Sequence, residues 1–451
     1  MGATDRFSDF VVGLSYGDIP EEGVRVAKEA ILDCLGCMLV GSRDRAGEIV
    51  SEYVRGIGAK PISTVIGRGF KSSPSLSALA NGVMAHAIDY DDISSPMIGH
   101  PSVPLVPAIL AVGEMVKASG RDIITAYVCG FEVEARLGLA LNPSHYDKGW
   151  HSTSTLGILG ASASSSKLLG LGKDEVKMAF GIASSTASGL KRNFGTMTKP
   201  FHPGNAARGG VEASILARMG FSSAPDILEA PFGFLEVFSG KEAPDIDKAL
   251  HKLGEEFEIL KSGIAFKPYP SCGATHPIIE AVLNLKNKLG IKPGDVEEME
   301  IVLNESMSSI LIYREPRTGL EGKFSAEYCA ALALVRDKIT LKDFEDEGVR
   351  RGEIREVMGR IKRKHEPLPT FSAAVVVRLG DGREFREFVE KSKGWPENPM
   401  SWDELSSKYI DCASYALGEG EVRESLKMIE GLEELRDISI LLDTVRGGDA
   451  F

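Results

Sequence analysis

Residues 73–102 read SPSLSALANGVMAHAIDYDDISSPMIGHPS, a stretch in which a helical pattern changes abruptly into a polar segment. Ser73 is a suitable N-cap, Pro74 fits the first turn of a helix, and apolar residues then recur at helical spacing. The pattern predicts a helix that runs through His86 to about Asp89. The residues that follow are rich in aspartate, proline, glycine and histidine, which is typical either of a solvated loop or of a functional site.

The same helical periodicity repeats on both sides of this stretch. Pro20 opens a pattern that continues to Gly41, and similar patterns follow one another as far as about residue 250. We therefore expect a large multihelical domain. The other helices that we expect in it are 104–118, 122–140, 152–169, 174–189 and 206–219.

After about residue 258 the period of the apolar residues changes. The segments MEIVL (299–303) and AAVVVRL (373–379) are rich in β-branched residues, and the second one continues into a hairpin that turns at Asp381-Gly382. Helical patterns alternate with these strands, which indicates a smaller α+β domain. The helices expected there are 275–289, 324–335 and 354–364.

The chain is therefore expected to be mostly α, with a multihelical domain over residues 1–262 plus 400–451 and an α+β domain over residues 263–399. The pattern becomes helical again from Trp402, which assigns the C-terminal segment to the helical domain. A length of 451 residues, 43% hydrophobic and 26% charged, is typical of a globular protein with more than one core.

The charge balance argues against polyanionic partners. A formal net charge of −12 disfavours binding to nucleic acid or to an anionic membrane, so an anionic ligand must be held by a local basic cluster. No apolar run approaches eighteen residues, and the first ten residues lack the features of a signal peptide, which predicts a cytoplasmic protein. The six cysteines are scattered, and we expect them to be reduced.

Five of the eight histidines lie in polar or Gly/Pro-rich segments that join or open helices. A single histidine in such a place is usually structural, but five together indicate a site, because binding groups concentrate on loops that a rigid scaffold positions. Histidine and aspartate are suited to moving a proton near neutral pH. The five are His86, His100, His151, His202 and His276.

Basic and hydroxyl residues accompany these histidines and predict a pocket for carboxylates. Positive charge and neutral donors beside histidine and aspartate together indicate proton abstraction next to a carboxylate group. The positive residues are Lys191, Arg192, Lys199, Arg208 and Lys267, and the neutral donors are Thr196, Thr198 and the start of a helix expected after Asn205.

Metal and cofactor chemistry find less support in the sequence. Asp89, Asp91, Asp92 and His100 carry suitable ligand atoms, but their spacing matches neither a zinc helix motif nor an EF-hand loop. The structural interpretation of Asp91 and Asp92 is that they end the helix and form the turn. Cys34 and Cys37 form a C-x-x-C pair inside a helix without a second pair. No nucleotide-binding glycine motif follows a strand, so we expect neither a metal nor a cofactor.

Six motifs in one order give the chain a specific resemblance to the MmgE/PrpD family, which contains 2-methylcitrate dehydratase, cis-aconitate decarboxylase and iminodisuccinate epimerase. The resemblance covers nearly the whole chain. It implies a helical domain, a smaller α+β lid domain, a homodimer and a cofactor-free site between the domains. The motifs are NGVMAHAIDYDD (81–92), GHPSVPLVPAILAVGE (99–114), GWHSTSTLGILGA (149–161), NFGTMTKPFHPGNAARGG (193–210), KPYPSCGATHP (267–277) and GKFSAEYCAALAL (322–334).

The resemblance also implies a set of site residues. Five of the six catalytic positions also belong to the polar segments and basic residues described above, whereas Tyr328 follows from the resemblance alone. The catalytic residues implied are Asp89, His100, His151, Lys199, Lys267 and Tyr328, and those expected to bind substrate are Thr198, His202, Ser271, Cys272 and His276.

One position departs from the family pattern. The decarboxylase and dehydratase branches commonly have a threonine where this chain has Ile93, so a hydroxyl that holds substrate or leaving group is missing unless Ser94 or Ser95 replaces it. The segments GHPS, GWHSTSTLG and FGTMTKP are more similar to the epimerase branch than to the other two branches.

Three hypotheses follow from these residues. The first is a 2-methylcitrate dehydratase-like lyase that removes a proton α to a carboxylate of a small di- or tricarboxylic acid, with Lys199 and Lys267 holding carboxylates. The second is an epimerase-like isomerase that uses the same acid/base residues, with His151 and Lys199 on opposite faces of one carbon. The third is a non-catalytic protein that binds such an acid. The identity of the base among His151, Lys199 and Asp89 stays open at this point.

Overall fold

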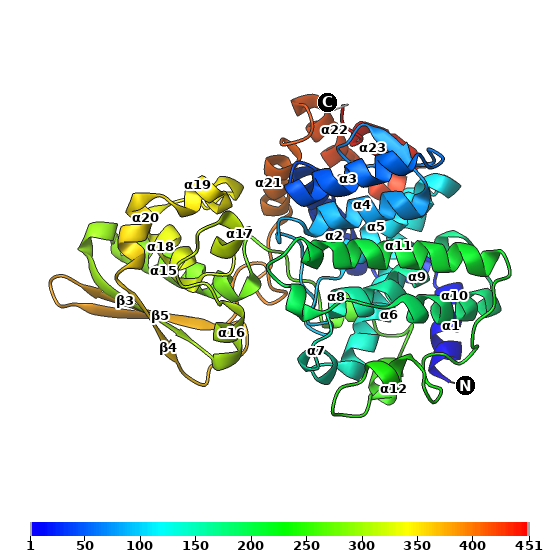
Figure 1. Cartoon of the computed structure of the whole chain (residues 1–451), viewed down its shortest axis with the longest axis horizontal. Coiled ribbons are helices and arrows are strands. Elements are labelled where there is room, and N and C mark those ends of the chain that lie inside the picture. The colour runs from blue at the N-terminus through cyan, green and yellow to red at the C-terminus, as the bar shows by residue number, and fades with distance from the viewer. Residues whose placement is uncertain (1, 449–451) are drawn as a thin grey trace. The chain divides into compact units, whose positions relative to one another are not determined.

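The computed structural model describes residues 2–448, which fold into two compact units (Figure 1). The first unit runs up to Ala265 and resumes at Ser401, and the second unit is Phe266–Met400. The first is almost entirely helical, whereas the second combines helices with a four-stranded sheet. The expectation of a mostly α protein with a smaller α+β part is therefore confirmed.

Four long helices form the centre of the first unit. α4 (Pro74–His86) begins with the expected proline, α5 (Ser102–Val116) follows the polar segment, and α6 (Gly120–Leu141) begins with a capping box between Ser119 and Asp122. α11 (Thr198–Arg218) packs against α4, α5, α9 and α10 (Figure 1). The other elements of this part are α1 (Ala3–Gly13), α2 (Glu21–Gly41), α3 (Arg45–Ile57), β1 (Ser63–Val65), β2 (Phe70–Ser72), α7 (Ser144–Asp147), α8 (Ser152–Thr155), α9 (Gly157–Leu168), α10 (Lys173–Thr186), α12 (Phe234–Phe238), α13 (Ile246–Leu250) and α14 (Glu258–Lys261).

α4 and α11 approach each other at two glycines. A Cβ atom on Gly82 would lie 2.6 Å from the Cα of Gly204, and a Cβ on Gly204 would lie 2.5 Å from the carbonyl oxygen of Leu79. Neither position has room for a side chain, so the two helix backbones are in direct contact. This contact sets the distance between the C-terminal end of α4 and the first turns of α11.

The expectation that α11 begins after Asn205 was wrong, because the helix begins at Thr198. Pro200 lies in the first turn, where backbone N–H groups have no acceptor within the helix, and Pro203 removes only one further hydrogen bond. Pro200, Pro203 and Gly204 are uncommon in helices, which is why the segment before Asn205 was predicted as a loop. Lys199 and His202 therefore lie on a helix.

The second unit is built on the sheet order β4-β3-β5-β6 (Figure 1). β3 (Val296–Leu303) pairs in antiparallel fashion with β5 (Ala373–Leu379), which forms the expected hairpin with β6 (Glu384–Val389). The helices α15 (His276–Leu289), α18 (Ala326–Val335) and α20 (Gly352–Met358) pack together and contribute to one apolar core with the sheet. The short helices α16 (Glu305–Ile310), α17 (Gly319–Gly322) and α19 (Asp346–Val349) connect them.

The helix expected over residues 354–364 was wrong in its second half. Residues Ile361–His365 form β4, which pairs in parallel with β3. The segment IKRKH has a low apolar content because it is an edge strand, and an edge strand commonly carries charged side chains. Its strand character depends on the pairing with β3 and not on its own composition.

The C-terminal helices α21 (Trp402–Ala413), α22 (Glu419–Glu430) and α23 (Ser439–Thr444) belong to the first unit, and α21 packs on α2. The buried Lys408 of α21 donates hydrogen bonds to the Asp33 side chain at 2.6 Å and to the carbonyl oxygen of Tyr90 at 2.7 Å. Its ammonium also lies 3.9 Å from the centre of the Tyr90 ring. Through Lys408, the end of the chain supports the polar segment that follows α4.

Within the described residues, no helix has both the length and the apolar content needed to span a membrane.

Candidate active site

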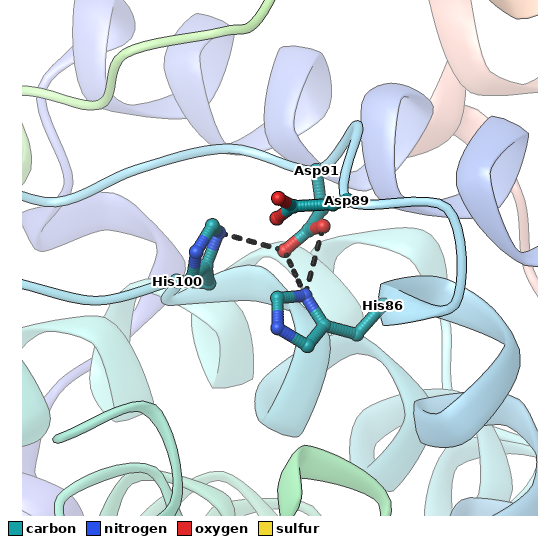
Figure 2. A group of neighbouring side chains, drawn as sticks. All are labelled: His86, Asp89, Asp91 and His100. Carbon is teal, nitrogen blue, oxygen red and sulfur yellow. Dashed lines mark hydrogen bonds and ion pairs between the residues drawn. The ribbon is translucent and has the colours of Figure 1, made fainter. Parts of the chain in front are cut away.

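The polar segment between α4 and α5 folds back on itself and returns His100 to the aspartates that begin it. α4 ends at His86, and Asp89 adopts a left-handed backbone with φ of 55°, which a short aspartate side chain tolerates better than most residues. Backbone hydrogen bonds between Ser94 and Gly99 close the loop. The segment is therefore an ordered structure, with its histidine and aspartates brought together (Figure 2).

Asp92 has the structural role that the sequence suggested. Its carboxyl group accepts hydrogen bonds from the backbone N–H and the hydroxyl of Ser102, the first residue of α5. The Ser102 hydroxyl also lies 2.8 Å from the hydroxyl of Tyr127. Burial raises the pKa of Asp92 well above its ordinary value, and the nearby Asp33 adds to this. Asp92 thus anchors the start of α5 as a buried acid.

Asp91 lies between two imidazole rings, as Figure 2 shows. Nδ1 of His86 is 2.9 Å from both carboxylate oxygens, and Nδ1 of His100 is 2.9 Å from Oδ2. Nδ1 of His100 also lies 2.8 Å from the backbone oxygen of Asp92. A nitrogen that faces only oxygen acceptors must carry the proton, so both rings donate from Nδ1.

The charges of this group follow from its burial. Burial lowers the pKa of His86 to about 3, so its ring is neutral at pH 7. Burial acts to raise the pKa of Asp91, but the two histidines outweigh this effect and hold it well below its ordinary value. Asp91 is therefore an anion that accepts hydrogen bonds from the two N–H groups. The other ring nitrogen of His86, Nε2, is buried and has no hydrogen-bond partner.

Lys199 and Asp89 form an ion pair between α11 and the segment after α4. Nζ of Lys199 is 2.9 Å from Oδ1 of Asp89, and both side chains are buried. The ammonium also lies 5.4 Å from the centre of the Phe194 ring. A cation held in this way is available to attract a carboxylate in a protein whose net charge is strongly negative.

His151 and His202 share a hydrogen bond between their Nδ1 atoms, which are 2.9 Å apart. Both side chains are buried, and burial lowers the pKa of His202 to about 4 and that of His151 well below its ordinary value. Because one Nδ1 must donate and the other accept, the two neutral rings hold opposite tautomers. His151 therefore presents either a proton or a lone pair at Nε2, depending on its partner.

The four rings form one continuous group. The ring centres of His86 and His100 are 4.6 Å apart, those of His86 and His151 are 6.1 Å apart, and those of His151 and His202 are 5.2 Å apart. The first unit thus brings together five of the predicted residues, which are Asp89, His100, His151, Lys199 and His202. His86 was one of the five histidines that indicated a site, but it was not among the residues that the resemblance implies, and Asp91 was given a structural role. A histidine five residues before an aspartate was the available signal.

Ligand atoms of His86, Asp89, Asp91 and His100 all lie within 4.8 Å of one another, so we tested this group as a metal site. Imidazole nitrogen and carboxylate oxygen are ligands that zinc accepts. Both Nδ1 atoms face Asp91 at hydrogen-bond distance and donate to its carboxylate in this arrangement, so a metal would have to bind at Nε2 or displace these hydrogen bonds.

The remaining predicted residues lie elsewhere. Thr198 is exposed at the first position of α11. In the second unit the Tyr328 hydroxyl donates to the backbone oxygen of Asp343, so its predicted catalytic role stays a prediction. In the second unit Lys267, Ser271 and His276 are buried and Cys272 is half-buried. Oγ of Ser271 is 2.7 Å from Oγ1 of Thr275, and Nε2 of His276 is 3.2 Å from the backbone oxygen of Ser271.

Ile93, which lies where the family commonly has a threonine, pairs through its backbone with a residue of the same unit. Ile93 exchanges two hydrogen bonds of 2.8 and 2.9 Å with the backbone of Ala265. Of the two possible replacements, Ser95 is exposed, whereas the Ser94 hydroxyl is buried without a hydrogen-bond partner. Ser94 is therefore the better placed of the two serines to serve in a buried site.

Comparison with known protein families gives two matches, which together cover most of the chain. The model of the MmgE/PrpD N-terminal domain matches residues 5–247, and that of the MmgE/PrpD C-terminal domain matches residues 269–434. The chain belongs to the MmgE/PrpD family.

Several members of this family are similar to the chain over most of its length. Cis-aconitate decarboxylases of Mus musculus and Homo sapiens are each 30% identical over 98% of this chain, and cover 93% and 94% of their own lengths. The 2-methylcitrate dehydratase of Cupriavidus necator is 24% identical over 79% of this chain and 78% of its own length. These relatives are lyases by name, which supports an enzymatic function for the chain.

Proposed function

We propose that the chain is a lyase that acts on a small di- or tricarboxylic acid and transfers a proton at a carbon next to a carboxylate. The observation that carries this proposal is the group of His100, His151, Lys199 and Asp89 in one buried site of the first unit. Such a site combines a cation for the substrate with imidazole nitrogens, which are suited to general acid–base catalysis.

We assign a role in the reaction to each of these residues. Lys199, paired with Asp89, binds a carboxylate, and Lys267 and Ser271 are proposed as further substrate-binding residues. His151 exchanges the proton with the substrate carbon, because its bond to His202 allows either tautomer. His100 presents Nε2 to the substrate. Thr198, Cys272, His276 and Tyr328 remain as further proposed contacts.

Within the lyases, we favour loss of carbon dioxide over loss of water. The decarboxylases match 98% of the chain at 27–30% identity, whereas the dehydratases match 79–82% at 22–24%. Ile93 replaces the threonine that is common to both branches and therefore does not distinguish them. In decarboxylation the electron pair of the broken carbon–carbon bond stays on the substrate carbon, which then takes one proton, so no further co-reactant is needed.

A substrate panel tests the proposal. The purified protein is incubated separately with cis-aconitate, 2-methylcitrate and citrate, and carbon dioxide release and the proton NMR spectrum of the products are recorded. We expect carbon dioxide from cis-aconitate, and loss of most of that activity in His151→Gln and Lys199→Met. Release of water without carbon dioxide would favour the dehydratase alternative. Inactivity on all three acids would contradict the proposal.

The same panel in deuterium oxide separates the isomerase alternative. An epimerase exchanges deuterium into recovered substrate without releasing carbon dioxide or water, whereas a decarboxylase places one deuterium on the product carbon that it protonates. A protein that binds these acids but neither exchanges nor converts them would be the non-catalytic alternative. Thermal stabilisation by each acid reports binding without turnover.

The proposal includes a cofactor-free, cytoplasmic homodimer, as the family resemblance implies. Light scattering of the purified protein measures its mass, and activity that persists after dialysis against EDTA and without added cofactors supports turnover by side chains alone.

A further inference from the structure

Asp91 has a place in the structure that its role as a turn residue does not explain. Its side chain is fully buried, and it meets two histidine rings from opposite ends of the polar segment, His86 at the end of α4 and His100 just before α5 (Figure 2). A turn-forming aspartate normally bonds to backbone N–H groups near it in sequence. The carboxylate of Asp91 instead accepts hydrogen bonds from imidazole rings.

The contacts of Asp91 determine which nitrogen of each ring carries the proton. Both Nδ1 atoms lie 2.9 Å from a carboxylate oxygen, and an ionised carboxylate only accepts hydrogen bonds. Each ring is therefore held with Nδ1–H toward Asp91, and in the neutral form of such a ring the lone pair lies at Nε2. The backbone oxygen of Asp92, 2.8 Å from Nδ1 of His100, reinforces the same tautomer.

We propose that Asp91 is a positioning residue that fixes His86 and His100 in the Nδ1–H tautomer, so that both rings present an unprotonated Nε2. The buried Nε2 of His86, which has no hydrogen-bond partner, is the second observation for this assignment, since an Nε2–H in the same place would be a buried donor left unsatisfied. One carboxylate thus prepares two adjacent imidazoles, whose ring centres are 4.6 Å apart, as proton acceptors.

The variant Asp91→Asn tests the tautomers directly. Oδ2 of Asp91 lies 2.9 Å from both Nδ1 atoms and Oδ1 lies 2.9 Å from that of His86, so a carboxamide of the same shape places its NH₂ donor against at least one Nδ1–H in either orientation. Histidines labelled with ¹⁵N report their tautomer through couplings between ring nitrogens and carbon-bound protons. The signals of His86 and His100 are assigned from their absence in His86→Gln and His100→Gln. In the unchanged protein we expect both rings to be in the Nδ1–H form. In Asp91→Asn at least one should become the Nε2–H form.

Asp92→Asn is the matched control. Asp92 is the neighbouring buried acid, its raised pKa makes the carboxamide a close substitute, and its contact with His100 uses the backbone oxygen, which the substitution keeps. Both rings should stay Nδ1–H in this variant. His145, whose Nδ1 donates to the backbone oxygen of Phe238 outside this group, is the internal reference for an intact fold.

The tautomers are measured without substrate, so this part stands apart from the proposed function. If Asp91→Asn leaves both rings as Nδ1–H while the His145 signal is unchanged, the proposal is overturned. Elemental analysis that finds a tightly bound metal, together with Nδ1 signals of metal-bound imidazole, would overturn it as well.

The catalytic consequence rests on the proposed function. With a substrate from the panel, Asp91→Asn should lower kcat by on the order of 10²–10⁴-fold with KM changed less than about threefold, because the wrong tautomer blocks proton acceptance. An unchanged kcat in a variant whose tautomers have switched would overturn the catalytic part. Inactivity of the unchanged protein on the whole panel would count against the proposed function alone.

Discussion

The predicted site residues in the two units are held in different ways. In the first unit, side chains from distant parts of the sequence bond to one another, as in the Lys199–Asp89 ion pair and the His151–His202 hydrogen bond. In the second unit, Ser271, Thr275 and His276 contact one another within a single turn. Contacts between distant side chains therefore hold the first group, whereas contacts within one turn connect these three residues of the second unit, and the two should respond differently to substitution.

Acidification should give the largest effect and should act on the first unit. Burial lowers the pKa of His86 to about 3 and those of His145 and His202 to about 4, while the unfolded chain binds protons near pH 6.5. The unfolded state then holds more protons between about pH 6.5 and pH 4, so stability present above this window is lost as the pH falls through it. Within this window each of these histidines lowers the free energy of unfolding by up to about 1.4 kcal/mol for each pH unit of acidification.

Hydrogen exchange measured by mass spectrometry at pH 7, 6 and 5, corrected for the intrinsic exchange rate, tests this difference. We expect protection to decrease first in the helices of the first unit. His145→Gln, which changes a buried histidine outside the candidate site, should reduce the pH dependence by one histidine's share. Equal loss of protection in both units would contradict the prediction.

Lys199→Met should have the next largest effect. The substitution removes the cation from a buried ion pair, which costs about 3 kcal/mol of unfolding free energy, and it also removes the proposed carboxylate-binding charge. Urea denaturation measures the loss. The double variant Lys199→Met/Asp89→Asn should recover part of the stability but none of the activity, and additive losses would show that the two side chains are not coupled.

Lys408→Met should be milder and should act on the site from a distance. The variant keeps most of the side-chain volume but removes the hydrogen bonds to Asp33 and to the carbonyl oxygen of Tyr90. We expect a loss of about 2 kcal/mol together with a lower kcat, because Tyr90 lies between Asp89 and Asp91. Lys391→Met, which changes a lysine of the second unit, is the control, and an equal loss in both variants would contradict the proposed support.

Ser271→Ala should have the smallest effect and should remain local. The substitution removes the hydroxyl contact with Thr275, with a loss of about 1 kcal/mol. If Ser271 binds substrate as proposed, KM should rise severalfold while kcat is retained. The tautomers of His86 and His100 should be unchanged, since their hydrogen bonds lie entirely within the first unit.

The sequence was sufficient for the elements whose own residues determine them. Ser73 and Pro74 predicted the start of α4, the β-branched run 373–379 predicted β5, and the turn at Asp381-Gly382 predicted the hairpin. It was insufficient where a neighbour decides the structure. β4 is a strand because β3 pairs with it, and α11 begins at Thr198 although two prolines lie in its first turns.

The site shows the same limit. The histidines and Lys199 could be selected from their polar contexts, but the role of Asp91 depends on two rings that approach it from either end of a folded segment. Its sequence neighbour Asp92 carries the same side chain and instead anchors Ser102. No pattern of residue types distinguishes these two aspartates, because the difference is made by the direction in which each side chain leaves the backbone.

The contact between Gly82 and Gly204 has a consequence for how the protein tolerates change. Asp89 follows the end of α4 and Lys199 lies near the start of α11, so the alignment of the pair depends on how closely the two helices approach at positions that bear no side chain. A single added methyl group would act as a spacer and would displace the two charges together with their helices. A displacement of about 1 Å is enough to lower a rate on the order of 10²-fold. Gly82→Ala should therefore resemble the loss of an active-site residue, although every reactive group is still present.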